Sequence, residues 1–202
     1  LKILGGEGIR VLLGAETQRV ARRANGIEIA VWHDGASETI AGSHLLVAAG
    51  RRPNSDRLNL EAAGIATDAH GTITVDDHLQ TNVPGVWALG DVNGRGAFTH
   101  TSYNDFEIVL DNLDGGTRAL SNRIPTYAVY IDPPLGRVGM SERQVREAGR
   151  QALIGVKPMA HIARAIERDE TAGLIKVLVD AETKLFLGAA VFGISSDTVG
   201  WM

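Results

Sequence analysis

The eleven residues from Thr81 to Asp91 constrain the fold of this chain more than any other part of its sequence. A turn-forming segment with a Pro-Gly pair leads into the continuously apolar run Val86–Leu89, which ends in Gly90 and Asp91. Such a run predicts a short strand that is buried on both faces, as in a parallel sheet. Ligands of open α/β sheets bind beyond the carboxyl ends of the strands, so this sequence predicts a binding site at Gly90 and Asp91.

Asp91 has two interpretations from the residues alone. Gly90 allows a ligand to approach the backbone, and the Asp91 carboxylate can accept hydrogen bonds from sugar-type hydroxyls. The alternative is an aspartate that only caps the loop 92–96.

The residues before this stretch predict β-structure. An alternating segment, Ile27–Trp32, is followed by Asp34-Gly35, a strong hairpin signal, and by a returning segment, Ser37–Ile40. The apolar run Leu45–Ala48 ends at Gly50 and predicts a second buried strand.

The residues after Asp91 predict helices and an antiparallel sheet. A helix is expected over residues 102–112, with a capping-box-like start and a buried stripe of apolar side chains. The stripe consists of Phe106, Val109, Leu110 and Leu113. A linker at 122–125 precedes an α+β unit. Its helix opens with the capping box Ser141–Gln144 and ends at Gly149, and its strands are expected at 127–131, 151–159, 174–179 and 186–192.

Composition excludes several classes of function. The net charge is −4 with scattered basic residues, and we expect no nucleic-acid partner. We find no membrane span and no signal peptide, and we expect a cytoplasmic protein that does not bind membranes. Cysteine is absent, which excludes disulfides and thiol nucleophiles within the chain. No metal site is predicted, because the histidines outside position 100 occur singly: His33, His44, His70, His78 and His161.

The stretch Thr81–Asp91 resembles the second flavin-binding motif of the pyridine nucleotide–disulfide oxidoreductases. The resemblance implies that Asp91 binds the ribityl chain of FAD, with Gly90 beside it. Residues 48–54 resemble the family's motif at the exit from the NAD(P) domain, which implies that Gly50 lies near the nicotinamide.

Two further segments resemble the same family. The resemblance implies that Phe98 and Thr99 face the flavin with backbone N–H groups and that His100 touches the flavin edge, although a surface histidine is an equal alternative. Pro133–Glu142 is similar to the opening of the family's dimerisation domain, which places Ala128 near the nicotinamide pocket.

The resemblance covers about residues 45–192 and implies an α/β and α+β fold. Residues 1–52 would end a Rossmann-like NAD(P)-binding domain, 53–118 would complete an FAD-binding domain, and 119–202 would form a truncated dimerisation domain. Both ends look like cuts through structure, with a new element beginning at Val199, so we expect the carboxy-terminal half of a longer protein.

The implied parent is a homodimeric FAD-dependent oxidoreductase of the mercuric-reductase-like or dihydrolipoamide-dehydrogenase-like branch. It would pass electrons from NAD(P)H through flavin to a disulfide, a metal ion or a related small-molecule acceptor. We assign no catalytic residue, because the family's redox cysteines and Gly-rich fingerprints do not occur in these residues, and we expect the chain alone to be inactive. The alternatives are an isolated dimerisation module and a cysteine-free flavoprotein reductase.

Overall fold

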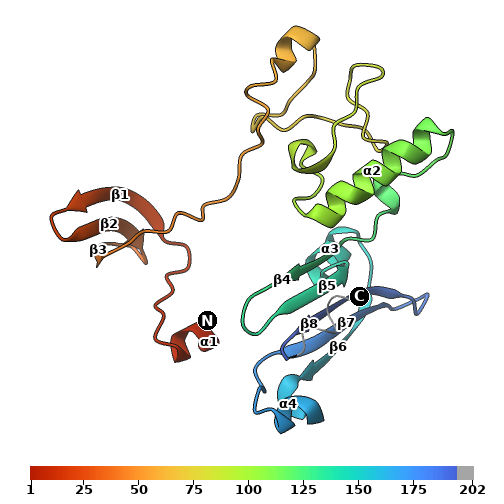
Figure 1. The fold of residues 1–202 in the computed structure, drawn as a ribbon. Helices are drawn as coiled ribbons and strands as arrows, with labels where there is room; N and C mark the ends of the chain where they lie inside the picture. The colour runs from red at the N-terminus through yellow and green to blue at the C-terminus, as the bar shows by residue number, and fades with distance from the viewer. Residues whose placement is uncertain (195–202) are drawn as a thin grey trace. The chain divides into compact units, whose positions relative to one another are not determined.

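The computed structural model describes residues 1–194, and the chain divides into two units, Leu1–Arg51 and Arg52–Met202. Each unit contains its own sheet (Figure 1). The element expected to begin at Val199 lies outside the described residues. The domain boundaries expected after residues 52 and 118 stay predictions.

The first unit contains a short helix and a three-stranded antiparallel meander. Its elements are α1 (Lys2–Gly6), β1 (Glu16–Arg23), β2 (Gly26–His33) and β3 (Ala36–Gly42). Strand β2 lies between the other two. Asp34 and Gly35 have positive φ values of 50° and 80°, as a two-residue primed hairpin turn requires. The meander and its hairpin are therefore confirmed.

The predicted strand Leu45–Ala48 is wrong in this structure. These residues have no regular secondary structure, and Leu46 and Val47 are 88% and 74% exposed. A central strand needs a hydrogen-bonded neighbour on each side, and no strand among residues 1–194 pairs with this run.

The predicted strand Val86–Leu89 is also wrong in extent. The run forms one isolated antiparallel bridge, between Trp87 and Gln80, and Leu89 is partly exposed. Ala88 is buried, and its N–H group donates to the carbonyl of Leu79. The apolar pattern identified a segment that contributes to a core, but both sheets of the described chain are antiparallel and lie elsewhere.

The first half of the second unit is built around one long helix and three short 3₁₀ turns. These elements are η1 (Leu60–Ala63), η2 (Gly90–Asn93), α2 (Thr99–Leu113) and η3 (Leu120–Asn122). Ile108 of α2 packs into a small core with Ile73, Val75, Leu79 and Ala88.

The buried stripe predicted for α2 is mostly wrong. The residues of this helix that are fully buried are Asp105 and Ile108, and of the predicted stripe only Val109 packs against the core. The helix also begins at Thr99, three residues earlier than predicted. The other three stripe residues lie on an exposed face with Tyr103: Phe106, Leu110 and Leu113.

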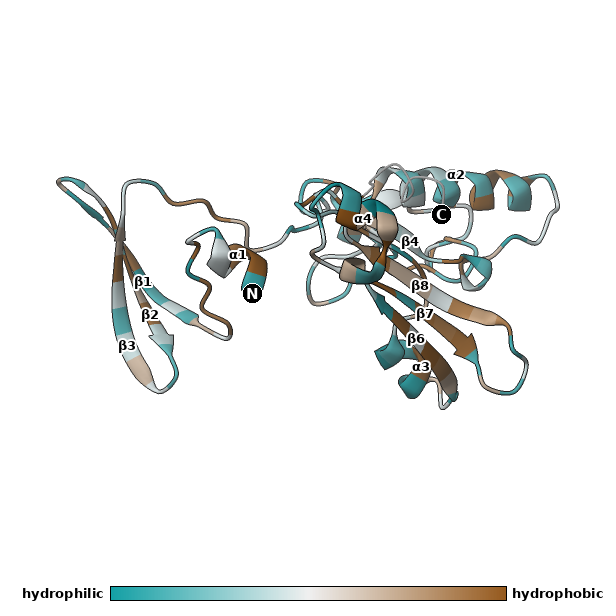
Figure 2. Ribbon diagram, turned by 90° about the horizontal axis from the view of Figure 1, so that it is seen from below, coloured by the Kyte–Doolittle hydropathy of each residue, from teal (hydrophilic) through white to brown (hydrophobic). Residues whose placement is uncertain are grey.

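The second half of this unit is a five-stranded antiparallel sheet in the order β4-β5-β8-β7-β6. Its strands are β4 (Thr126–Val129), β5 (Leu135–Gly139), β6 (Ala152–Pro158), β7 (Leu174–Asp180) and β8 (Phe186–Phe192). Its helical elements are α3 (Glu142–Glu147), η4 (Met159–His161) and α4 (Ala163–Glu167). Strands β6 to β8 carry long hydrophobic stretches (Figure 2).

Helices α3 and α4 pack on opposite faces of this sheet. Val145 of α3 contacts Leu178 of β7, whereas Ala165 of α4 lies in a cluster that includes Ile175. Positions 175 and 178 differ by an odd number, so their side chains point to opposite faces of the strand. The predicted α+β unit is confirmed. Strand β5 was not predicted, because the preceding Pro133-Pro134 pair favours a break.

Candidate cofactor site

The turn η2 holds Gly90 in a conformation that suits glycine. Its φ is +74°, and a Cβ atom added to Gly90 would lie 2.9 Å from the hydroxyl oxygen of Ser102 in α2. The turn therefore lies directly against the first part of α2, and a side chain at position 90 would disturb both. This close approach brings Gly90 and Asp91 beside the amino-terminal end of the helix.

Asp91 is exposed and, contrary to the prediction from the sequence, does not stand at the end of a buried strand. The reason is that the preceding residues form no sheet strand, so Asp91 lies in the turn η2 on the surface. An exposed carboxylate keeps its capacity to accept hydrogen bonds from hydroxyl groups.

The buried carboxylate of the site is Asp105, which is 2% exposed. Its Oδ2 atom accepts hydrogen bonds from the backbone N–H of Gly90 and from Nδ2 of Asn93, each at 2.8 Å. Its Oδ1 atom pairs with Arg123. From the sequence alone, Asp105 is only part of the capping-box-like start expected for this helix. The sequence contained one signal for the burial of Asp105. This residue lies three residues before Ile108 and therefore on the same, apolar face of the helix.

The start of α2 supplies backbone and side-chain groups. Phe98 donates its N–H group to Oγ1 of Thr101 at 3.0 Å, so this donor, expected to face flavin, has an acceptor within the helix start. Thr99 is the first helical residue, and the helix itself provides no acceptor for its N–H group. His100 lies with Nε2 2.7 Å from the carbonyl oxygen of Thr126 in β4.

An aromatic stack connects the start of α2 with the sheet. The ring of Phe98 stacks on His100 at 5.3 Å between centroids and on Tyr127 of β4 at 5.8 Å. Arg137 of β5 lies over the Tyr127 ring and donates from Nη1 to its hydroxyl at 2.9 Å. The start of α2 and the sheet are therefore joined by ring stacking and by the hydrogen bond between His100 and Thr126.

The remaining two predicted site residues, Gly50 and Ala128, lie far from the turn in the sequence and have different structural surroundings. Ala128 pairs with Gly136 in the β4–β5 ladder, two residues after Thr126, so it lies close to the aromatic stack. Gly50 belongs to the other unit, with a φ of 101° in an irregular segment. The second unit thus contains Gly90, Asp91, Phe98, Thr99, His100 and Ala128.

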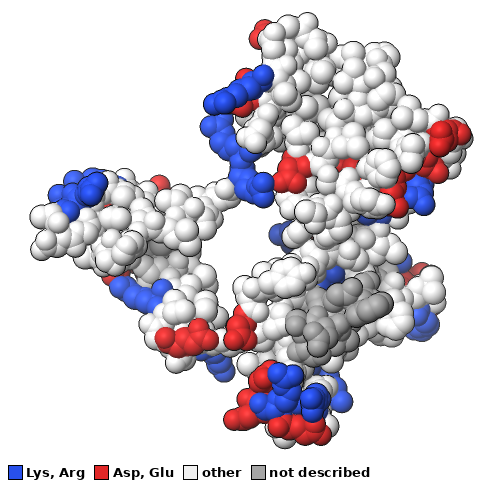
Figure 3. Space-filling model, viewed as in Figure 1, with Lys and Arg blue, Asp and Glu red and all other residues white. Residues whose placement is uncertain are grey.

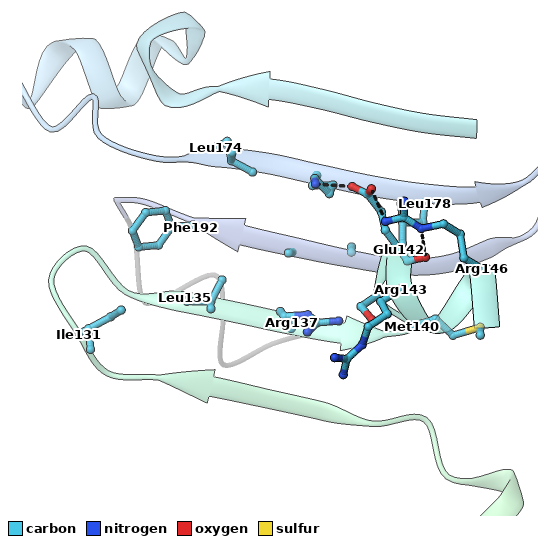
Figure 4. Close-up of a pocket in the computed structure, with 14 residues that line it drawn as sticks. Ile131, Leu135, Arg137, Met140, Glu142, Arg143, Arg146, Leu174, Leu178 and Phe192 are labelled. Atoms are coloured by element: carbon cyan, nitrogen blue, oxygen red, sulfur yellow. Dashed lines mark hydrogen bonds and ion pairs between the residues drawn. The ribbon is translucent and has the colours of Figure 1, made fainter. Parts of the chain in front are cut away.

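A groove of about 690 Å³ lies on the face of the sheet beside α3 (Figure 4). One end is apolar, with Leu135, Leu174 and Phe192. At the other end Glu142 accepts from Lys176 at 2.5 Å, and this ammonium group lowers the pKa of the Glu142 carboxyl. The groove shares Arg137 with the aromatic stack.

Charges elsewhere on the second unit are mixed. Around α4, Arg164 pairs with Glu167 and Arg168 with Glu170. Figure 3 shows positive and negative side chains next to one another in this part of the molecule. Within residues 1–194 there is no cluster of three or more potential metal ligands. Among the same residues, no helix combines the length and apolar character needed to cross a membrane.

The second unit thus combines a glycine–aspartate turn against a helix start with an α+β sheet unit. A model of the pyridine nucleotide-disulphide oxidoreductase family matches residues 1–105, and the model of the family's dimerisation domain matches residues 125–199. The chain belongs to the pyridine nucleotide-disulphide oxidoreductase family.

Curated relatives cover nearly the whole chain. The probable pyridine nucleotide-disulfide oxidoreductase RclA of Escherichia coli is 38% identical over 197 residues, which are 96% of this chain and 44% of the relative. A mercuric reductase of Lysinibacillus sphaericus is 34% identical, over 94% of this chain and 35% of that protein. A dihydrolipoyl dehydrogenase of Thermus scotoductus is also 34% identical, over 95% and 42%. The chain thus spans less than half the length of these relatives.

Solved structures agree with this assignment. The HOCl-induced flavoprotein disulfide reductase RclA from Escherichia coli has a TM-score of 0.84 and 37% identity, over 98% of this chain and 45% of that one. A Cu(II) complex of the same protein matches equally well, with a TM-score of 0.84.

Proposed function

We propose that this chain is the carboxy-terminal part of an FAD-dependent oxidoreductase that takes electrons from NADH or NADPH. The flavin would accept a hydride from the nicotinamide and pass electrons to a disulfide, a metal ion or a related acceptor. The relatives support this assignment by name, since they include a flavoprotein disulfide reductase and mercuric reductases.

The observation that carries the proposal is the turn Gly90–Asn93, fastened to α2 by the buried Asp105. The residues fit a bound flavin. Asp91 offers an exposed carboxylate to ribityl hydroxyls. The absence of a side chain at the buried Gly90 lets the turn pack against Ser102 of α2 and so holds Asp91 beside the helix start. The first turn of α2 directs N–H groups and the positive end of the helix dipole outward, which favours negative charge on a nearby ring.

The other predicted site residues have different roles in the proposed flavin site. Thr99 keeps its role as a backbone donor, because the helix supplies no acceptor for it. Phe98 and His100 contribute mainly through their stacked rings, since Phe98 N–H and His100 Nε2 have partners within the chain. Ala128 and Gly50 are proposed to lie near the nicotinamide, by resemblance alone.

We also propose that the full-length protein is a cytoplasmic homodimer. The match of residues 125–199 to the family's dimerisation domain supports the dimer. The same match, together with that of residues 1–105, favours an oxidoreductase over an isolated interaction module and over a cysteine-free reductase.

The test is purification of the full-length protein followed by flavin analysis and turnover assays. We expect FAD to co-purify in about one equivalent per chain, and we expect NADH or NADPH oxidation that depends on added disulfide or metal-ion acceptor. A full-length protein that neither retains FAD nor binds it on reconstitution would overturn the proposal. Separate assays with a disulfide and with a metal ion then decide which class of acceptor the full-length protein reduces.

A further inference from the structure

The turn that carries Asp91 is held at both ends by one oxygen atom. The Oδ2 atom of Asp105 accepts from the N–H of Gly90, the first residue of η2, and from the side chain of Asn93, the last. Asn93 also donates to the carbonyl of Ala88 at 2.9 Å, before the turn. Asp91 therefore lies between two points that are fixed to the same carboxylate.

A buried carboxylate is costly unless it is hydrogen-bonded and paired with a cation. Arg123 lies beside the second oxygen of Asp105 and is itself largely buried, with 12% of its side chain exposed. Its Nε atom donates to Oδ1 of the neighbouring Asn104 at 2.7 Å, which fixes the guanidinium plane. The charge of Asp105 is thus compensated inside the protein, and the cost of its burial is reduced.

Arg123 also connects the turn with the sheet. It lies between η3 and β4, three residues before Thr126, the first residue of β4. The carbonyl of Thr126 is the acceptor facing His100, in the first turn of α2. Residues 123–126, which lead into the sheet, are therefore attached to α2 at two positions. Arg123 pairs with Asp105, and the carbonyl of Thr126 faces His100 at the helix start.

We propose that Asp105 is a positioning residue for flavin binding. It fixes the turn Gly90–Asn93 so that Asp91 and the start of α2 keep one mutual arrangement, and Arg123 holds the Asp105 side chain in place for this task. The inference rests on the proposed flavin site. A merely structural ion pair would stabilise the fold but would leave the affinity of the folded protein for FAD unchanged.

The experiment compares Asp105→Asn with Asp77→Asn in the full-length protein. Asp77 is the matched control, because its carboxylate also accepts from a backbone N–H and a hydroxyl, both of Ser121, and so joins distant segments. The measurements are the dissociation constant of FAD from the apoprotein and thermal melts with and without saturating FAD.

We expect Asp105→Asn to weaken FAD binding about five- to thirtyfold, since the amide keeps one acceptor oxygen but loses the charge. Asp77→Asn should lower the melting temperature and change FAD affinity less than about twofold. Unchanged FAD affinity in folded Asp105→Asn would overturn the positioning role.

Two further variants separate the possible failures. If Asp91→Ala weakens FAD binding and Asp105→Asn does not, the positioning role of Asp105 is wrong but the flavin site stands. If neither variant changes the affinity for FAD, the flavin site itself is wrong. When Asp105→Asn does not fold, Arg123→Lys replaces it. Lysine keeps the charge without the guanidinium fork, so we expect FAD affinity to fall about two- to fivefold. Unchanged affinity in folded Arg123→Lys would also contradict the proposal.

Discussion

The ring nitrogen Nε2 of His100 lies 2.7 Å from the carbonyl oxygen of Thr126 and ties the first turn of α2 to the first residue of β4. A carbonyl oxygen only accepts hydrogen bonds, so Nε2 carries the hydrogen in this arrangement. The contact gives His100 a structural role at the place where resemblance implies a contact with flavin.

Replacing His100 tests how much this hydrogen bond contributes to the stability of the protein. We expect His100→Ala to lower the free energy of unfolding of the full-length protein by about 0.5–1.5 kcal/mol, the usual contribution of one hydrogen bond. His100→Gln should restore part of the loss, because its amide can donate. Urea unfolding measures both variants. His44→Ala is the control, since this exposed ring lies with Nδ1 3.0 Å from the hydroxyl of its sequence neighbour Ser43 and so joins no distant segments. An equal loss there would contradict the account.

The capping box at Ser141 gives a second prediction. The Ser141 hydroxyl accepts from the N–H of Gln144, and the Gln144 side chain accepts from the N–H of Ser141 at 2.8 Å. Ser141→Ala should therefore destabilise the protein by about 1 kcal/mol, whereas Ser141→Asp should keep most of the stability. Denaturant titration is the measurement. If the alanine and aspartate variants proved equally stable, the cap would not contribute as described.

Asp180 predicts a pH dependence of stability. The N–H of Thr183, the guanidinium of Arg150 and the N–H of Glu182 stabilise its carboxylate and lower the pKa of Asp180 to about 2. An unfolded aspartate has a pKa of about 3.9. Because the folded pKa is lower, the stabilisation is fully present above about pH 4 and is lost as the pH falls towards 2.

The comparison of wild type with Asp180→Asn isolates this group from other carboxylates. We expect the variant to be less stable at neutral pH and the difference in unfolding free energy to shrink between about pH 4 and pH 2. Urea unfolding of both proteins across this range is the measurement. A difference that stays constant, or that grows on acidification, would contradict the assignment.

Local signals in the sequence predicted local structure well. Asp34-Gly35 specifies its hairpin and Ser141 with Gln144 specifies its helix start, because each signal and the structure it forms lie within four residues. The family resemblance also singled out Gly90 and Asp91, because the motif is continuous in the chain, and their role in flavin binding stays a prediction.

Features that depend on distant partners were missed. The runs Leu45–Ala48 and Val86–Leu89 have the composition of buried strands, but a strand forms only where other segments supply its hydrogen bonds. The burial of Asp105 depends on Arg123, 18 residues later, and on the return of Gly90 to the helix. Neither relation is visible as a pattern in the sequence.

The most direct test of the flavin site is the dissociation constant of FAD from the full-length apoprotein with Asp91→Ala, measured beside thermal melts. Asp111→Ala serves as the control, since Asp111 is a partly exposed carboxylate in the later part of α2. The account predicts that Asp91→Ala weakens FAD binding about ten- to a hundredfold, because one or more bonds to a charged acceptor are lost. Asp91→Asn should cause a smaller loss and Asp111→Ala none. An unchanged dissociation constant in folded Asp91→Ala protein would contradict the assignment of Gly90 and Asp91 to the flavin site.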